Sequence, residues 1–161
     1  MSGRLLESMR EADRVDVLAL NDRFQHLTAP LDLDGLLRLE AAGTVEVIRA
    51  AGGFAGFVVT LPDDAAHDSA NLAWFRERFE GFVYLDRIIV HEDFHRQGLA
   101  RRTYDEVEER TARRTPLLTL EVNTDPPNEP SLAFHAARGF EQVGERLIED
   151  HTVAMMVKRL R

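Results

Sequence analysis

The chain has 161 residues, a length that favours one domain with a complete core, and 44% of its residues are hydrophobic. The absence of cysteine excludes disulfide bonds, thiolate metal sites and a cysteine nucleophile, and is compatible with a reducing cytosol. The net charge of −8 disfavours binding to nucleic acid, and no stretch has the character of a signal peptide or a membrane span, so we expect a cytoplasmic protein.

Hydrophobic periodicity and turn residues divide the first half of the chain into short elements without an internal repeat or a linker. In chain order, we expect a strand, one or two short helices, two antiparallel strands joined at a glycine turn, and a helix inside a long insert. Their ranges are residues 15–21, 22–42, 44–50 with 53–61, and 70–79 within the insert 62–81. A connection as long as this insert is more often functional than a simple link.

The second half of the chain is more regular, with strands and helices in alternation before a final pair of strands. The predicted ranges are a strand at 82–90, a helix at 98–113, a strand at 116–123, a helix at 130–138, and strands at 140–149 and 151–160. A strand, a helix and a second strand in succession require a crossover, so the two strands around the first helix should be parallel. The sequence therefore predicts one α+β domain over residues 1–161, with a mixed sheet flanked by helices.

A basic turn, "HRQGLA", joins the strand at 82–90 to the next helix. The first N–H groups of a helix lack helical partners, and the macrodipole adds partial positive charge there. Gly98 removes the side chain where a ligand would come closest, and Arg96 and Gln97 add donors, so the turn suits a phosphate or pyrophosphate. The alternative is an ordinary connection with solvated arginines, since neither "GxxxxGK[ST]" nor "GxGxxG" is present.

Two motifs in order resemble those of the GNAT N-acetyltransferase superfamily. The turn resembles its acyl-CoA pyrophosphate motif, Arg/Gln-x-x-Gly-x-Gly/Ala, with a departure at the first position: the corresponding residues are His95, Gly98 and Ala100. Downstream, "NEPSLAFHAARGF" resembles Asn-x-x-Ser/Ala-x-x-x-Tyr-x-x-x-Gly-Phe, with histidine at the tyrosine position: the corresponding residues are Asn128, Ser131, His135, Gly139 and Phe140. The phrases "HDSANLAWF", "YLDRIIV" and "EVNTDPPN" also resemble a bacterial subgroup of predicted acetyltransferases.

The resemblance implies a fold and a co-substrate. It implies a mostly antiparallel sheet whose two central parallel strands splay apart and hold acetyl-CoA between them, in keeping with the rule that open sheets bind ligands at strand ends. The pantetheine arm would pair with the first strand, and the pyrophosphate would lie on the turn. The implied cofactor-binding residues are Ile88, Ile89, Val90, His95, Arg96, Gln97, Gly98, Leu99, Ala100, Asn128 and Ser131. No metal is expected, because His67 and His91 form no recognisable metal constellation.

Acetyl transfer to an amine requires a neutral amine, a polarised thioester carbonyl and a proton for the departing thiolate. A main-chain N–H of Ile89 or Val90 is the candidate for stabilising the oxyanion. Period-two alternation predicts one strand face for Tyr84, Asp86, Ile88 and Val90. Asp86 would then attract the ammonium or accept its proton, and the alternative is an ion pair with an arginine.

Further residues are candidates for contact with the amine substrate. Tyr84 lies on the first parallel strand, and Glu121 and Asn123 lie on the second. The insert adds an acidic and aromatic segment that would suit a cationic amine, unless its helix packs into the core: Asp63, Asp64, Asp68, Trp74 and Phe75.

The resemblance implies that His135 replaces a tyrosine that protonates the CoA thiolate in many members. A histidine with its ordinary pKa of ~6.5 is a poorer proton store above neutrality than a tyrosine, and the alternative role for His135 is packing. The predicted function is acetyl-CoA-dependent N-acetylation of a primary amine, small molecule or peptide, by direct attack in a ternary complex. The alternative is a non-catalytic acyl-CoA-binding or sensing module, and a homodimer is left open.

Overall fold

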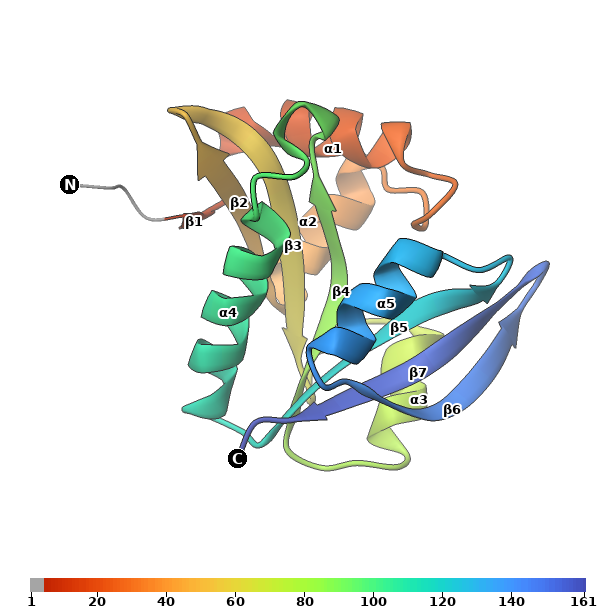
Figure 1. The fold of residues 1–161 in the computed structure, drawn as a ribbon. Coiled ribbons are helices and arrows are strands. Elements are labelled where there is room, and N and C mark those ends of the chain that lie inside the picture. Colours follow the sequence, from red (N-terminus) through yellow and green to blue (C-terminus); the bar gives the residue numbers. More distant parts are fainter. Residues whose placement is uncertain (1–4) are drawn as a thin grey trace.

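A seven-stranded sheet forms the centre of the molecule, with the strand order β1-β2-β3-β4-β5-β7-β6 (Figure 1). The computed structural model describes residues 5–161. The strands are β1 (Leu6–Ser8), β2 (Thr44–Ala50), β3 (Gly53–Pro62), β4 (Phe82–Val90), β5 (Leu117–Asp125), β6 (Glu141–Ile148) and β7 (His151–Arg159). Neighbouring strands pair antiparallel, except that β4 and β5 are parallel. This confirms the predicted mixed α+β fold.

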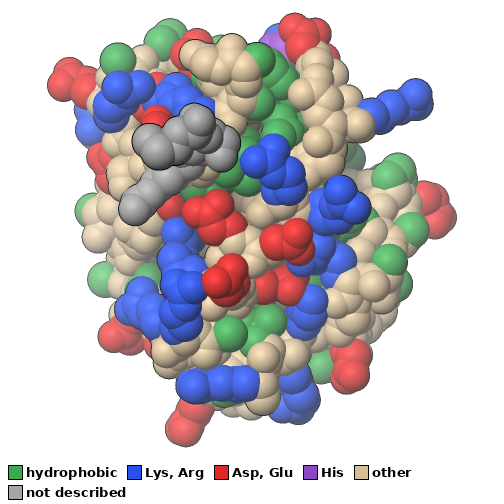
Figure 2. Space-filling model, turned by 60° about the vertical axis from the view of Figure 1, so that its left-hand side comes forward, with side chains coloured by type: hydrophobic (Ala, Val, Ile, Leu, Met, Phe, Trp, Pro, Cys, Tyr) green, Lys and Arg blue, Asp and Glu red, His purple; other side chains and the backbone are tan. Residues whose placement is uncertain are grey.

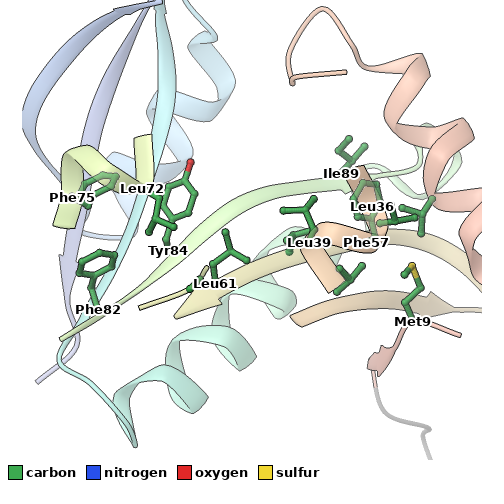
Figure 3. Close-up of a cluster of buried hydrophobic side chains, with 14 of the residues drawn as sticks. Met9, Leu36, Leu39, Phe57, Leu61, Leu72, Phe75, Phe82, Tyr84 and Ile89 are labelled. Atoms are coloured by element: carbon green, nitrogen blue, oxygen red, sulfur yellow. The ribbon is translucent and has the colours of Figure 1, made fainter. Parts of the chain in front are cut away.

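Helices cover both faces of the sheet. The helical elements are η1 (Glu11–Asp13), α1 (Arg14–Arg23), α2 (Leu33–Ala42), α3 (Ala70–Arg76), η2 (Glu92–Phe94), α4 (Leu99–Ala112) and α5 (Glu129–Ala137). Apolar side chains of α1, α2 and α3 pack into one cluster on the sheet, part of which is shown in Figure 3. Those of α4 and α5 belong to a second cluster on the opposite face. In the part of the chain that the structure describes, no helix is long and apolar enough to cross a membrane.

The strand predicted over residues 15–21 is wrong, because this segment lies within helix α1. The helix buries Val17, Leu20 and Asn21, which are three and four positions apart, and it leaves Val15 71% exposed. Several apolar residues in a short segment satisfy a strand pattern and a helix pattern at once, and the tertiary packing decides between them. The first strand of the sheet is β1, which pairs with β2.

The parallel strands β4 and β5 pair only at their beginnings. The three paired positions are Phe82 with Leu117, Val83 with Leu118 and Tyr84 with Thr119. Farther along, β4 continues beside β3 as far as Val90, and β5 continues beside β7 as far as Asp125. The facing edges of β4 and β5 therefore separate over the second part of each strand, as the resemblance implied, and their backbone groups there lack partners in the sheet.

An ion pair connects α4 to the sheet. Arg110 of α4 donates two hydrogen bonds, of 2.7 and 2.9 Å, to the carboxylate of Glu46 on β2. Figure 2 shows the side of the molecule that carries α4, where basic and acidic side chains are interspersed. This contact joins the last turn of α4 to β2.

Candidate active site

A cleft of about 950 Å³ occupies the space where β4 and β5 separate. Both strands line it, together with the loop of residues 24–30 between α1 and α2, residues 67–69 before α3, and residues 148–151 between β6 and β7. Side chains of α4 and α5 complete one wall. We call the side next to α4 and α5 the cofactor end, and the side next to the loop 24–30, α3 and the β6–β7 turn the acceptor end.

At the cofactor end, the turn before α4 presents main-chain N–H groups. Gly98 precedes the helix with φ 72°, and Arg96 has φ 67°, so the chain takes a left-handed conformation twice within three residues. Arg102 donates to the Gly98 carbonyl at 3.0 Å, so the N–H groups of the preceding first turn point out of the helix end. A Cβ atom at Gly98 would meet only the tip of Arg101, at 3.5 Å, so the space above the turn is open.

The predicted cofactor-binding residues divide into two groups. Residues of β4, the residue before the turn and two residues of α5 or its cap line the cleft: Ile88, Ile89, Val90, His95, Asn128 and Ser131. The others form the turn at the start of α4 and are not among the cleft-lining residues: Arg96, Gln97, Gly98, Leu99 and Ala100. The side chain of Leu99 is buried in the core, so only its main chain is available to a ligand.

The open edge of β4 carries the N–H of Val90. His91 donates its N–H to Ala55 of β3 at 2.7 Å. Because successive N–H groups along a strand point to opposite edges, the N–H groups of Val90 and Ile88 face the side from which β5 has separated. Of the two candidates for stabilising an oxyanion, the N–H of Ile89 faces β3 and the N–H of Val90 faces the cleft.

The sequence-based assignment of one strand face to Tyr84, Asp86, Ile88 and Val90 is wrong, because β4 contains a bulge. Val59 lies opposite Arg87 and Thr60 opposite Leu85, which leaves Asp86 as an extra residue. Beyond the bulge the alternation is reversed. Tyr84 packs in the cluster under α1, α2 and α3, whereas Ile88 and Val90 pack toward α4 and α5.

At the acceptor end, Tyr84 and Glu121 meet across the cleft. The Tyr84 hydroxyl donates to the two carboxylate oxygens of Glu121, at 2.7 and 2.9 Å. Figure 3 shows the ring of Tyr84 in the apolar cluster, with its hydroxyl pointing out of it. Burial raises the pKa of Glu121 to about 8, although the Tyr84 hydrogen bond opposes the shift, and the charge of Asp86 raises it further. Glu121 therefore exchanges a proton close to neutral pH.

Asp86 forms the ion pair that the sequence left as an alternative to a catalytic role. Arg87 donates to its carboxylate at 2.7 Å, and both side chains are 10% exposed. Asp86 nevertheless lines the cleft near Glu121, whose pKa it raises. A direct role of Asp86 with the amine stays a prediction.

His135 is buried on α5, with hydrogen bonds at both ring nitrogens. Its Nδ1 lies 2.7 Å from the Ser131 carbonyl, and its Nε2 lies 2.7 Å from the Tyr104 hydroxyl. A carbonyl only accepts, so Nδ1 carries the hydrogen, and Nε2 accepts from Tyr104. Burial lowers the pKa of His135, so the imidazole is neutral at neutral pH. Its role as a proton donor stays a prediction, now with Tyr104 as a partner.

Several cleft residues were not found from the sequence. Tyr104 has the helical spacing of a core residue, and its place at the cleft depends on how α4 packs against α5. Asn71 of α3, the loop 24–30 and the β6–β7 turn lie far from β4 and β5 in the sequence. In the insert, only Asp68 of the predicted acidic and aromatic set lines the cleft. The two aromatic residues pack into the core instead: Phe75 is fully buried, and Trp74 packs against the same cluster.

The sequence matches the model of the acetyltransferase (GNAT) family over residues 7–140. The chain belongs to this family. No curated protein sequence matches it. Among the residues that the structure describes, no group of three or more histidines or acids has the arrangement of a metal site.

Solved structures share the fold. The chain is 18% identical to the ribosomal-protein-S18-alanine N-acetyltransferase of Escherichia coli, with a TM-score of 0.72 and coverage of 96% of this chain and 92% of that one. Arabidopsis thaliana Naa50, in complex with the bisubstrate analogue CoA-Ac-MVNAL, is 15% identical with a TM-score of 0.71, and 95% and 96% are covered. The yncA protein of Salmonella typhimurium, solved with its cofactor acetyl-CoA, is 16% identical with a TM-score of 0.69, and 99% and 95% are covered.

As a member of this family, the chain is an acetyltransferase that uses acetyl-CoA. Three features of the structure fit this co-substrate: the open turn at Gly98 for the pyrophosphate, the unpaired edge of β4 for the pantetheine amides, and the cleft of about 950 Å³ between the separated strands. Bound acetyl-CoA supplies the activated acetyl group as a thioester. The chain itself supplies the groups that orient the reactants and move protons.

Proposed function

We propose that this acetyltransferase acetylates a primary amine, of a small molecule or a peptide, by direct attack while both substrates are bound. The observation that carries the proposal is Glu121, a carboxylate in the cleft with a pKa raised to about 8. A group with this pKa near the reacting amine is suited to accept its proton at physiological pH.

Acids surround the acceptor end. Asp68, Glu149 and Asp150 line the cleft together with Asp86 and Glu121, and Arg87 is the only lysine or arginine among the lining residues. Negative charge at this end favours an acceptor that arrives as an ammonium ion. Glu121 then takes the proton, directly or through a water molecule, and the amine becomes a nucleophile.

The remaining steps are assigned to the cofactor end. The main-chain N–H of Val90, which faces the open edge of β4, is proposed to stabilise the negative charge that develops on the thioester oxygen. The proton for the departing thiolate is assigned to the Tyr104–His135 pair. Because burial lowers the pKa of His135, we propose the Tyr104 hydroxyl rather than an imidazolium as the donor: the hydroxyl turns from His135 Nε2 and gives its proton to the thiolate sulfur, and water returns a proton to the Tyr104 oxygen after CoA leaves. Burial raises the pKa of Tyr104, so the hydroxyl keeps its proton until the thiolate forms.

Release of free CoA over a panel of amines tests the proposal. We expect thiol release that depends on the amine and on acetyl-CoA, together with a product that mass spectrometry identifies as the N-acetyl amine. Acetyl-CoA binding without amine-dependent thiol release across the panel would instead favour a binding or sensing module.

A further inference from the structure

Arg87 connects three parts of the acceptor end. Its Nε donates to Asp86 at 2.7 Å, and its guanidinium Nη1 donates to Asn21 Oδ1 at 2.9 Å and to the Ala29 carbonyl at 3.0 Å. These partners belong to β4, to the end of α1 and to the loop that follows α1. A planar guanidinium can donate to all three at once, whereas an ammonium on a flexible chain has no such fixed geometry.

The Ala29 carbonyl is an anchor point for the loop 24–30. Besides the bond from Arg87, it accepts a hydrogen bond of 3.0 Å from the amide of Asn21, a residue that is fully buried. At the other end of the loop, the ring of Phe24 lies 6.3 Å from the ring of His95, and Leu27 and Thr28 donate to the Phe24 carbonyl. The loop is thereby held at both ends, and all of its residues line the cleft.

The same arginine also sets the direction of a carboxylate. The bulge at Asp86 turns this side chain out of the regular alternation of β4, and Arg87 holds it at a defined position. Bulges next to active sites commonly redirect a side chain in this way. One buried guanidinium thus fixes both the wall of the acceptor end and the acid beside Glu121.

We propose that Arg87 is a positioning residue for the amine acceptor: it holds the loop 24–30 and Asp86 in the arrangement that the acceptor binds. This inference rests on the proposed amine acetylation. Arg87 holds other groups in place and does not itself contact the reacting atoms. Its effect should therefore appear in the binding of the amine and leave the binding of acetyl-CoA unchanged.

Arg87→Lys tests the proposal, with Arg49→Lys as the matched control. Arg49 is also largely buried and donates two hydrogen bonds to Asp13, at 2.9 and 3.0 Å, but neither residue lines the cleft. In steady-state kinetics, we expect Arg87→Lys to raise KM for the amine by roughly tenfold, with KM for acetyl-CoA unchanged. Arg49→Lys should leave both KM values unchanged.

A second variant removes the other donor to the Ala29 carbonyl. Asn21→Asp keeps an oxygen for Arg87 and leaves the bond from Arg87 to Ala29 in place, so it should raise KM for the amine in the same direction as Arg87→Lys and by less. It tests the anchor of the loop at Ala29 independently of the folding of Arg87→Lys. Equal amine KM values in Arg87→Lys and Arg49→Lys, or a parallel change of both KM values and kcat, would overturn the proposal.

Hydrogen exchange provides a readout that needs no turnover. The amides of Leu27 and Thr28 should exchange faster in Arg87→Lys and Asn21→Asp than in the wild type and Arg49→Lys, because each variant removes one of the two donors to the Ala29 carbonyl. Wild-type protein that acetylates no amine would refute the proposed function, and this arm would still show whether Arg87 holds the loop. Unchanged exchange in both variants would overturn the positioning role.

Discussion

The two ends of the cleft are built in different ways. The cofactor end combines main-chain groups of two adjoining segments, the end of β4 and the start of α4, with a few side chains of α4 and α5. The acceptor end consists of side chains from β4, β5, α3, the α1–α2 loop and the β6–β7 turn. A main-chain site tolerates many side chains but requires a particular backbone. A side-chain site depends on the identity of each residue and on the packing of distant segments.

This difference has a consequence for the chemistry. The proposed contacts of acetyl-CoA with β4 and the turn are N–H groups and helix polarity, which do not titrate, whereas the acceptor end contains Glu121, whose pKa is raised to about 8. Substitutions at the acceptor end should therefore change the pH dependence of the reaction. Substitutions in the turn should change affinity for acetyl-CoA at every pH.

The largest effect is expected for Glu121→Gln. The amide keeps the size of the carboxylate and cannot accept the proton of an ammonium, so kcat/KM for the amine should fall by ~10²–10⁴-fold. Acetyl-CoA affinity, measured by calorimetry, should not change. In the wild type, kcat/KM should rise with pH until about 8, where Glu121 is deprotonated, and this rise should be absent in the variant. A variant that keeps the wild-type pH profile would show that another group is the base.

Gly98→Glu should have the opposite effect: it should lower the affinity for acetyl-CoA rather than change the pH dependence of the reaction with the amine. Negative charge and bulk at the proposed pyrophosphate position should weaken acetyl-CoA binding by ~10²-fold or more, since like charges in contact cost several kcal/mol. The left-handed conformation at this position, φ 72°, costs a non-glycine residue ~1–2 kcal/mol of stability.

Gly52→Glu is the control for this variant. Gly52 has φ 76° in the turn between β2 and β3, and a Cβ atom there would meet nothing within 4 Å. It imposes the same backbone cost and adds the same charge away from the cleft. Equal acetyl-CoA affinities of the two variants in calorimetry would show that the pyrophosphate does not bind at the turn.

The contrast between the two ends also explains what the sequence could predict. The turn and the cap of α5 follow from short contiguous motifs around Gly98 and Asn128, because local backbone geometry needs particular residues at fixed spacings. The element order from β2 to β7 was predicted to within a few residues for the same reason. The family assignment depended on these motifs.

The acceptor end could not be predicted in this way. The contact between Tyr84 and Glu121 joins residues 37 positions apart, and that between Arg87 and Asn21 joins residues 66 apart. The bulge at Asp86 reverses the side-chain alternation on β4 without a marker such as glycine or proline. Helix α1 was mistaken for a strand, so the loop that follows it could not be placed beside the cleft.

A smaller effect on catalysis is expected for Tyr104→Phe. The change removes only the hydroxyl that bonds to His135, and if this hydroxyl protonates the thiolate, kcat should fall by ~10–10²-fold. KM for acetyl-CoA should stay constant. The variant also leaves Nε2 of a buried histidine without a donor, which should lower the free energy of unfolding by ~1–3 kcal/mol. A folded variant with wild-type kcat would show that the pair serves packing alone.

The smallest effects concern the pH dependence of stability, which should have opposite signs at the two ends. Glu121 has a pKa of about 8 in the folded chain against 4.5 as its ordinary value, so the folded state binds more protons between these values and stability falls as pH rises through them. His135 has a pKa below 6.5 in the folded chain, so the unfolded state binds more protons, and stability is lost as pH falls below 6.5.

Glu121→Gln should remove the first loss, that on the alkaline side, and be more stable than the wild type above pH 8, by roughly 1–3 kcal/mol. His135→Gln should remove the second loss and leave the alkaline side unchanged. Urea unfolding of the three proteins between pH 5 and pH 9 measures both slopes, at about 1.4 kcal/mol per pH unit for one proton at most. Parallel pH profiles for the wild type and Glu121→Gln would mean that Glu121 is ionised in the folded chain at neutral pH, and that its proton affinity is set by Tyr84 rather than by burial.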